Sequence, residues 1–295
     1  MEQLVDVLPV QNVLGESVLW NVRTARLWWT DIQARRLFRY DPVARVLDEI
    51  ETPERVSAFA FVAGTDGLIV AFESGLALFN PSDRSAEWLY RLEPGPVPIR
   101  FNDGCTDRQG RFWAGTMVEG DSHPALGRLH CVGPGGRVSV HLDPVHISNA
   151  LCTSPDGSRF YLADSPLRTI FAYDLDGVTG ELANRRVFAR TPEGAFPDGA
   201  HVDCDGFVWN AHWGAGRVVR YAPDGTIDRV VEVPASQPSC VAFGGSNLNL
   251  LFVTSARDGL KEDALLGQPS AGNLFVYRTD VAGLPDAEFI FDGGG

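Results

Sequence analysis

The feature that most constrains this chain is a repeat of two short strands joined by a glycine-containing turn. The clearest copies begin at Asn102, Asn149 and Asp198, and each continues into a second strand that is rich in aromatic residues. Looser copies begin at Glu16, Ser57 and Ser239. The second strands end near residues 30, 71, 115, 163, 211 and 254. A period of roughly 40–50 residues with about four strands per unit is typical of β-propeller blades.

Six copies predict an all-β fold, a six-bladed β-propeller. Residues 4–8 precede the first copy, and we expect them to supply the outer strand of the last blade, beside residues 273–277. Since the blades of a closed ring support one another, the sequence predicts a single domain over residues 1–295.

Composition and charge exclude several classes of protein. The chain is 44% hydrophobic and 21% charged, which excludes a disordered chain. A net charge of −13 argues against nucleic acid as a partner and suits a protein that handles a cation or a neutral metabolite. No apolar run approaches the ~20 residues that span a membrane. An acidic start and five scattered cysteines predict a cytoplasmic protein without a disulfide framework. The oligomeric state stays open.

Motif searches exclude several chemistries. The single lysine, Lys261, lies in a polar stretch, so a Schiff base is not expected. The chain has no Gly-x-Ser-x-Gly, His-Glu-x-x-His or Cys-x-x-Cys, the motifs of serine hydrolases, zinc proteases and zinc fingers.

Alignment of the six copies places an oxygen-bearing side chain at the same point of every innermost strand, at the predicted mouth of the channel. These ring positions are Glu16, Ser57, Asn102, Asn149, Asp198 and Ser239. Two carboxylates brought together repel each other unless they share a proton or a cation, and carboxylate and amide oxygens suit a hard divalent ion. We therefore predict that Glu16, Asn149 and Asp198 bind one metal ion, with Asn102 as the next candidate. Taken singly, Asn102 and Asp198 are also ordinary turn residues.

Other polar residues fall near the same end of the predicted channel. Arg100 precedes Asn102 by two residues and is a candidate to contact hydroxyl or carboxylate groups of a substrate, although a surface arginine is the alternative. His212 is expected to pack inside its blade, and the role of His146 stays open. Cys105 and Cys152 occupy equivalent positions of two copies and are expected to be buried and non-catalytic.

An ordered set of motifs resembles the SMP-30/gluconolactonase/luciferin-regenerating family, called regucalcin in animals. The motifs are LGESVLW at 14–20, RFNDG at 100–104, GRFWAGTM at 110–117, ISNAL at 147–151, FPDG at 196–199 and VTSARDG at 253–259. The resemblance implies a six-bladed propeller with one catalytic divalent metal, held by Glu16, Asn149 and Asp198. It also implies substrate contacts from Arg100 and Asn102 and a general base at Asp198.

Two positions depart from the family pattern. Ala150 follows Asn149 where the family more often has glycine. The acidic substrate contact after the GTM motif falls near Glu119, and its role is not assigned.

The sequence therefore predicts metal-dependent hydrolysis of a sugar aldonolactone, of the glucono-, xylono- or arabinono-lactone type, to the sugar acid. The expected partner is a small sugar lactone, with neither nucleic acid nor membrane. Calcium is the favoured ion, and zinc, manganese and iron(II) remain alternatives. Two other functions stay open: an aryl-esterase or organophosphate hydrolase on the same scaffold, which should have a more apolar pocket, and a non-enzymatic calcium-binding propeller.

Overall fold

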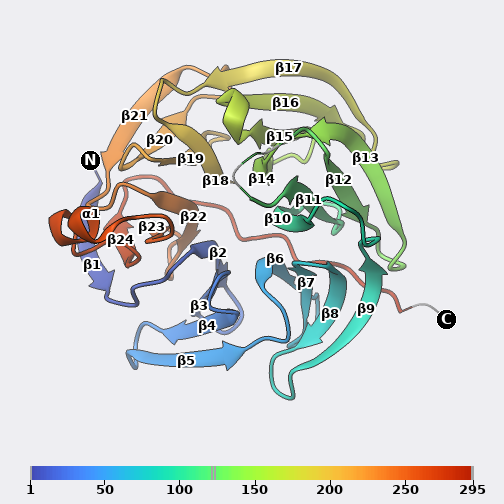
Figure 1. Cartoon of the computed structure of the whole chain (residues 1–295), viewed down its shortest axis with the longest axis horizontal. Helices are drawn as coiled ribbons and strands as arrows, with labels where there is room; N and C mark the ends of the chain where they lie inside the picture. The colour runs from blue at the N-terminus through green and yellow to red at the C-terminus, as the bar shows by residue number, and fades with distance from the viewer. Residues whose placement is uncertain (1, 121, 123, 294–295) are drawn as a thin grey trace.

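The computed structural model describes residues 2–120, 122 and 124–293, and it arranges them as six four-stranded antiparallel sheets around a central axis (Figure 1). The innermost strands are β2 (Gly15–Asn21), β6 (Val56–Phe61), β10 (Ile99–Thr106), β14 (Ser148–Thr153), β18 (Phe196–Val202) and β22 (Pro238–Gly244). The second strands are β3 (Arg26–Asp31), β7 (Leu68–Phe72), β11 (Phe112–Val118), β15 (Arg159–Asp164), β19 (Val208–Trp213) and β23 (Leu250–Ser255).

The outer half of each sheet completes the blade. The third strands are β4 (Arg36–Asp41), β8 (Gly75–Asn80), β12 (Gly127–Val132), β16 (Thr169–Leu175), β20 (Arg217–Tyr221) and β24 (Leu274–Arg278). The outermost are β5 (Val46–Glu51), β9 (Ser85–Arg91), β13 (Val138–Val145), β17 (Leu182–Arg190), β21 (Ile227–Glu232) and β1 (Gln3–Leu8). Since each innermost strand packs against those of its neighbours, including β22 against β2, the sheets close into a ring. The predicted six-bladed propeller is confirmed.

The ring is closed by the two ends of the chain. Strand β1 pairs with β24 in the last blade, with Gln3 opposite Arg278 and Leu8 opposite Leu274. This is the pairing that the sequence predicted for residues 4–8. That the whole chain behaves as a single domain stays a prediction.

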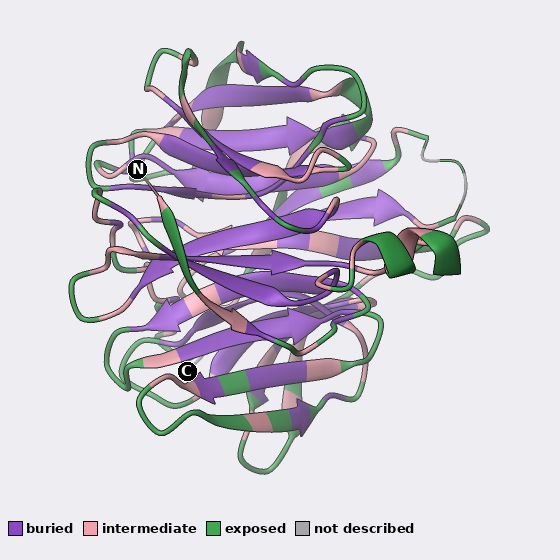
Figure 2. Ribbon diagram, turned by 90° about the vertical axis from the view of Figure 1, so that its left-hand side faces the viewer, coloured by how far each residue is buried: buried purple, intermediate pink, exposed green. Residues whose placement is uncertain are grey.

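Buried tryptophans form hydrogen bonds that stabilise two of the blades. Figure 2 shows that burial follows the strands, whereas exposed residues gather in the turns. Trp113 and Trp209 are fully buried on second strands, and their indole N–H groups donate to Asp107 and Asp203 respectively, each over 2.8 Å. An indole N–H buried without a partner would cost about 1–3 kcal/mol. The same carboxylates accept hydrogen bonds from Arg111 and Arg220. Asp107 therefore joins strand β11 to the turn before it, and Asp203 joins strands β19 and β20.

A C-terminal strap, residues 279–292, crosses the end of the channel that lies opposite the predicted ring positions (Figure 1). The strap forms backbone hydrogen bonds with several blades: Cys204 N to Ala282 O, Gly283 N to Leu248 O, Phe289 N to Phe61 O and Ile290 N to Gly110 O, over 2.7–3.0 Å. Phe289 is fully buried in a cluster between the second and third blades. The strap therefore joins blades that are distant in sequence.

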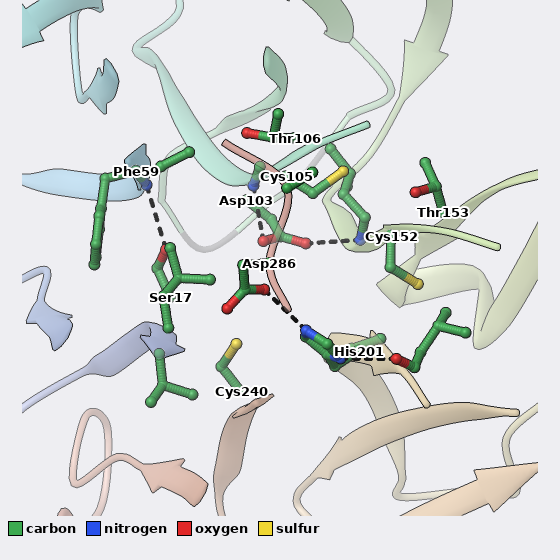
Figure 3. Close-up of a pocket in the computed structure, with 18 of the residues that line it drawn as sticks. Ser17, Phe59, Asp103, Cys105, Thr106, Cys152, Thr153, His201, Cys240 and Asp286 are labelled. Carbon is green, nitrogen blue, oxygen red and sulfur yellow. Dashed lines mark hydrogen bonds and ion pairs between the residues drawn. The ribbon is translucent and has the colours of Figure 1, made fainter. Parts of the chain in front are cut away.

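A small cavity of about 60 Å³ lies inside the channel beside the strap (Figure 3). Asp286 of the strap lies 2.9 Å from His201 Nε2 and accepts a hydrogen bond from the backbone of Trp20. Cys105 and Cys152 line the same cavity. Burial raises the pKa of both thiols, which disfavours reactive thiolates and agrees with the expectation that these residues are not catalytic.

Helical structure is confined to two short segments of the described residues. They are the 3₁₀ turn η1 (Ser165–Leu167) and helix α1 (Glu262–Gly267), which the sequence analysis did not predict. Within the described ranges, no helix is both long and apolar enough to cross a membrane.

We predict that the strap contributes substantially to stability. Phe289→Ala should lower the free energy of unfolding by about 3–5 kcal/mol, because the buried ring leaves a cavity between two blades. Leu266→Ala, on the exposed face of α1, is the control and should change little. Denaturant unfolding measures both variants, and equal midpoints for the two would contradict the packing described for the strap.

Candidate active site

The candidate site begins with an irregularity that recurs in all six innermost strands. Each of these strands shifts its pairing register with the second strand at the predicted ring position. The extra residues fall after Glu16 and Asn149, and they include Asn102 and Asp198 themselves. Such β-bulges turn side chains away from the regular alternation and are common beside active sites.

The bulges place unusual demands on the backbone. Ser17 and Ala150, directly after Glu16 and Asn149, have φ angles of 48° and 54°, in the left-handed region. This conformation costs a residue other than glycine roughly 1–2 kcal/mol, and it explains why glycine is common at the position of Ala150. In the fifth blade, Asn210 supports the bulge, because its Nδ2 donates to Asp198 O over 2.6 Å and to Gly199 O over 3.2 Å.

A cavity of about 480 Å³ opens at the ring end of the channel. Four of the six predicted ring residues line it, namely Glu16, Asn102, Asn149 and Asp198, together with Arg100. Its apolar walls include Leu14, Ile32, Met117, Ile147, Phe196 and Trp213. The two remaining ring residues hold neighbouring blades together: Ser57 Oγ donates to Phe101 O over 2.7 Å, and Ser239 Oγ donates to Gly15 O.

The acidic residues of the site are buried and close together. Glu16 and Asp198 line the same cavity, and their carboxyl groups are close enough to interact electrostatically. Burial, followed by the charge of Asp103, raises the pKa of Glu16 to about 8. Burial and the charge of Glu16 raise the pKa of Asp198 well above its ordinary value. Without a counter-charge, the pair therefore holds a proton at neutral pH.

The chemistry of these side chains fits a hard cation. The two carboxylates and the amide oxygen of Asn149, which line one cavity, are oxygen donors of the kind that calcium and similar ions prefer. Across the described residues, no cluster of three or more His, Cys, Asp and Glu side chains is arranged to bind a metal. A cation here would therefore depend on the amide as well as on the two acids.

Hydrogen bonds connect the amides of the site to its arginine. Arg100 Nη1 donates to Asn102 Oδ1 over 2.9 Å, and Asn102 Nδ2 donates to Asn149 Oδ1 over 3.0 Å. Burial lowers the pKa of Arg100. Because Arg100 is the only cationic residue among the described residues that line the cavity, it supplies the positive charge of this wall.

Glu119, whose role the sequence left open, lies at the rim beside Arg100. Its carboxylate accepts two hydrogen bonds from Arg55, over 2.5 and 2.8 Å, and lies 3.5 Å from Arg100 Nε. The guanidinium of Arg55 is the main cause of the lowered pKa of Glu119. Glu119 is thus an ionised group held between two arginines.

His146 and His212 do not line the cavity that contains the predicted metal ligands. His212 is fully buried, 3.0 Å from the hydroxyl of Tyr221, and burial lowers its pKa to about 3, so it packs inside its blade as expected. His146 Nδ1 lies 2.8 Å from Asp164 Oδ2. No histidine occurs among the described residues that line the cavity.

Three residues near the site received no role from the sequence. Asp258 and Ser165 line the cavity, and Asp103 lies within the innermost strand β10, where its carboxylate accepts from Gly104 N and Leu151 N. Asp103 and Ser165 lie outside the aligned ring positions, so the repeat did not single them out. The VTSARDG motif contains Asp258, and this motif was the available signal.

Comparison with known families places the chain. Residues 14–257 match the SMP-30/Gluconolactonase/LRE-like region. The chain belongs to this family, as its motifs indicated.

Individual relatives agree with this placement. The L-arabinolactonase of Azospirillum brasilense is 41% identical over 283 residues, covering 95% of this chain and 93% of the relative. The 6-deoxy-6-sulfogluconolactonase of Pseudomonas putida is 37% identical over 294 residues, covering 99% of both. Among solved structures, a calcium-binding protein, regucalcin, from Agrobacterium tumefaciens superimposes with a TM-score of 0.91 at 29% identity, covering 97% of each chain.

The raised pKa of Glu16 leads to a prediction for the metal-free protein. The folded-state pKa of about 8 exceeds the ordinary value of 4.5, so the folded protein binds more protons than the unfolded chain between these values. Stability should therefore fall as pH rises through this window, and the raised pKa of Asp198 acts in the same direction. Glu16→Gln removes one ionisable group and should make the dependence shallower. Thermal melting in the presence of a chelator measures the effect, and identical pH profiles for the two proteins would contradict the buried-acid assignment.

Proposed function

We propose that this chain is a sugar lactonase that hydrolyses an aldonolactone to the sugar acid with the help of one divalent cation. The observation that carries the proposal is the pair of buried carboxylates, Glu16 and Asp198, in one cavity that also presents Asn149, Asn102 and Arg100. Relatives that match nearly the whole chain are named lactonases, which supports the reaction class.

Glu16, Asn149 and Asp198 would hold the cation. Their oxygens are hard donors. Among the described residues no cationic side chain forms an ion pair with Glu16 or Asp198, which supports a cation at this point. Calcium is our first choice among divalent ions, and the calcium-binding regucalcin that this fold resembles supports it. When bound, the cation would polarise the lactone carbonyl and stabilise the negative charge that develops on its oxygen.

The side chains would share the remaining tasks. Asp198 would accept a proton at its carboxylate from the attacking water, whose oxygen bonds to the carbonyl carbon. The bond between that carbon and the ring oxygen breaks, and the proton held by Asp198 passes to the ring oxygen, which leaves as a hydroxyl. Arg100 and Asn102 would hold the sugar hydroxyls so that the lactone enters in one orientation. The burial of Asp198 separates it from bulk water, which suits a base that acts on one held molecule.

The charges around the cavity favour an uncharged lactone. Arg100 is already bonded to Asn102 and to Phe101 O, and it lies near the carboxylate of Glu119. Asp258 adds a negative charge to the lining. A phosphate or sulfonate on the sugar would therefore meet repulsion from Asp258, while Glu119 offsets part of the charge of Arg100. We propose a neutral pentono- or hexonolactone, in contrast to the sulfonated sugar in the name of one relative.

The apolar walls give a specific reason to keep a second candidate function. Phe196, Met117 and Trp213 could accommodate the ring of an aryl ester, which the same carboxylates and cation could cleave. A comparison of substrates separates the two functions.

We predict the following order of turnover in a substrate panel. Neutral L-arabinono- and D-gluconolactone should be hydrolysed faster than a lactone with a phosphate at its far end, and faster than phenyl acetate. Chelation should abolish the activity, and addition of calcium, manganese or zinc should restore it. If phenyl acetate is the fastest substrate, the esterase function replaces the lactonase function. If no substrate is turned over while calcium binds, the chain is a non-enzymatic calcium-binding propeller.

We also predict that substitutions at Asp198 and Arg100 have different kinetic effects. Asp198→Asn keeps one carbonyl oxygen for the cation but cannot accept a proton, so kcat should fall by about 10²–10⁴-fold. Arg100→Ala should raise KM more than it lowers kcat, because Arg100 would hold the sugar and would not touch the reacting atoms. Asp263→Asn, on the exposed face of α1, is the control. Near-normal kcat in a cation-loaded Asp198→Asn variant would refute the assignment of the base.

A further inference from the structure

Ser165 connects two of the proposed cation ligands at a point where neighbouring blades meet. It begins the turn η1 after strand β15, and its residue surface is 6% exposed. Its Oγ donates to Pro197 O over 2.7 Å and accepts a hydrogen bond from Asn149 Nδ2 over 2.8 Å. Pro197 directly precedes Asp198, so the hydroxyl joins the strand of Asn149 to the strand of Asp198.

We infer that Ser165 is a positioning residue that fixes the orientation of the Asn149 amide, so that Asn149 presents oxygen to the proposed cation. The inference rests on the cation site of the proposed function. It concerns a residue that never has to contact the cation itself.

The orientation of Asn149 follows from the single hydrogen that the Ser165 hydroxyl can donate. A hydroxyl has one hydrogen, and the carbonyl of Pro197 can only accept, so this contact uses the hydrogen of Ser165. The hydroxyl oxygen can then only accept from Asn149. An asparagine amide has nearly the same shape in its two orientations, and only the NH₂ end can donate. The NH₂ end of Asn149 must therefore face Ser165.

The other side of Asn149 imposes the same orientation. Arg100 has only donors, so Asn102 meets it with its oxygen, over 2.9 Å. The NH₂ group of Asn102 is thereby directed to Ser148 O and to Asn149 Oδ1, each over 3.0 Å. The hydrogen bonds thus run in one direction through the site, from Arg100 through Asn102, Asn149 and Ser165 to the carbonyl of Pro197. An inverted Asn149 amide would face NH₂ with NH₂ on one side and oxygen with an already committed hydroxyl on the other.

The orientation matters because the two ends of an amide differ as ligands. The carbonyl oxygen binds hard cations, whereas the NH₂ nitrogen has no lone pair available for them. Asn149 Oδ1 accepts one hydrogen bond from Asn102, which leaves a second lone pair for the cation. Without the Ser165 hydroxyl, Asn149 Nδ2 loses its acceptor and Pro197 O loses its donor. The preference for the productive orientation then falls.

The test measures cation affinity directly, by calorimetric titration of metal-free protein with calcium. Ser165→Ala should weaken binding by about 10–100-fold, the range seen when groups that orient metal ligands are removed. Ser165→Thr keeps the hydroxyl and should retain most of the affinity of the unmodified protein for calcium. Ser165→Cys has a weak donor and acceptor, and it should weaken binding in the same direction as alanine. An unchanged dissociation constant in both the alanine and cysteine variants would overturn the inference.

A matched control separates positioning from general stability. Ser57 is also a buried serine at a ring position, and its hydroxyl also donates to a backbone carbonyl, that of Phe101. Ser57→Ala should lower the melting temperature of the metal-free protein about as much as Ser165→Ala does, while the calcium dissociation constant stays that of the unmodified protein. A similar loss of affinity in both variants would show that Ser165 acts only through packing.

A double-mutant cycle tests the orientation of the Asn149 amide. Asn149→Asp offers oxygen at both ends, so orientation no longer matters. Ser165→Ala should then cost little affinity in the Asn149→Asp background. A full loss in that background would contradict the proposed mechanism of Ser165. If the unmodified protein binds no divalent cation at all, the cation site of the proposed function is wrong, an outcome distinct from a failure at Ser165 alone.

Discussion

At the mouth of the channel, each innermost strand holds more residues than the strand beside it. Regular pairing would send alternate side chains into the packed space between blades. The bulges interrupt that alternation at one level of the ring, and oxygen-bearing side chains such as Glu16 and Asp198 reach the cavity as a result. The left-handed backbone at Ser17 and Ala150 is the energetic cost of this arrangement. The packed blades around the ring stabilise it.

The electrostatics of the site follow from the same convergence. Glu16, Asp198 and Asp103 are all buried, and burial is the largest cause of the raised pKa of each, to about 7 for Asp103. A metal-free site of this kind is destabilising, because the folded protein must either hold protons or tolerate repulsion between the acids. Bound cation would remove that penalty, so the geometry that costs stability in the metal-free protein is the geometry that favours a cation.

The fold and the ring positions could be predicted from the sequence because the same strand pattern recurs in every blade. Six copies of one strand pattern defined the blades, and the shared register located Glu16, Asn102, Asn149 and Asp198 before any contact was known. The alignment placed Ser57 and Ser239 in the same ring without predicting their role, which is to hydrogen-bond to the backbone of the adjacent blade. Only the four longer side chains reach the cavity.

The contacts of residues outside the repeat could not be predicted from the sequence. Ser165 comes from a turn that ends a second strand, and Arg55 meets Glu119 from a different blade, so no alignment of the copies brings them together. The strap has no counterpart in the other blades either. Its contacts with Phe61, Gly110 and Cys204 depend on three-dimensional arrangement rather than on local pattern.

The pairing of β1 with β24 has a consequence for the order in which the molecule can assemble. Residues 3–8 are made before the rest of the propeller, yet their partners, residues 274–278, are made after all the other strands. During synthesis the first five blades can form one after another from local hairpins, while β1 still presents unpaired backbone groups. A contact across nearly the whole chain also closes slowly. The sixth blade is therefore the stage at which an unfinished chain is most exposed to pairing with the wrong strand.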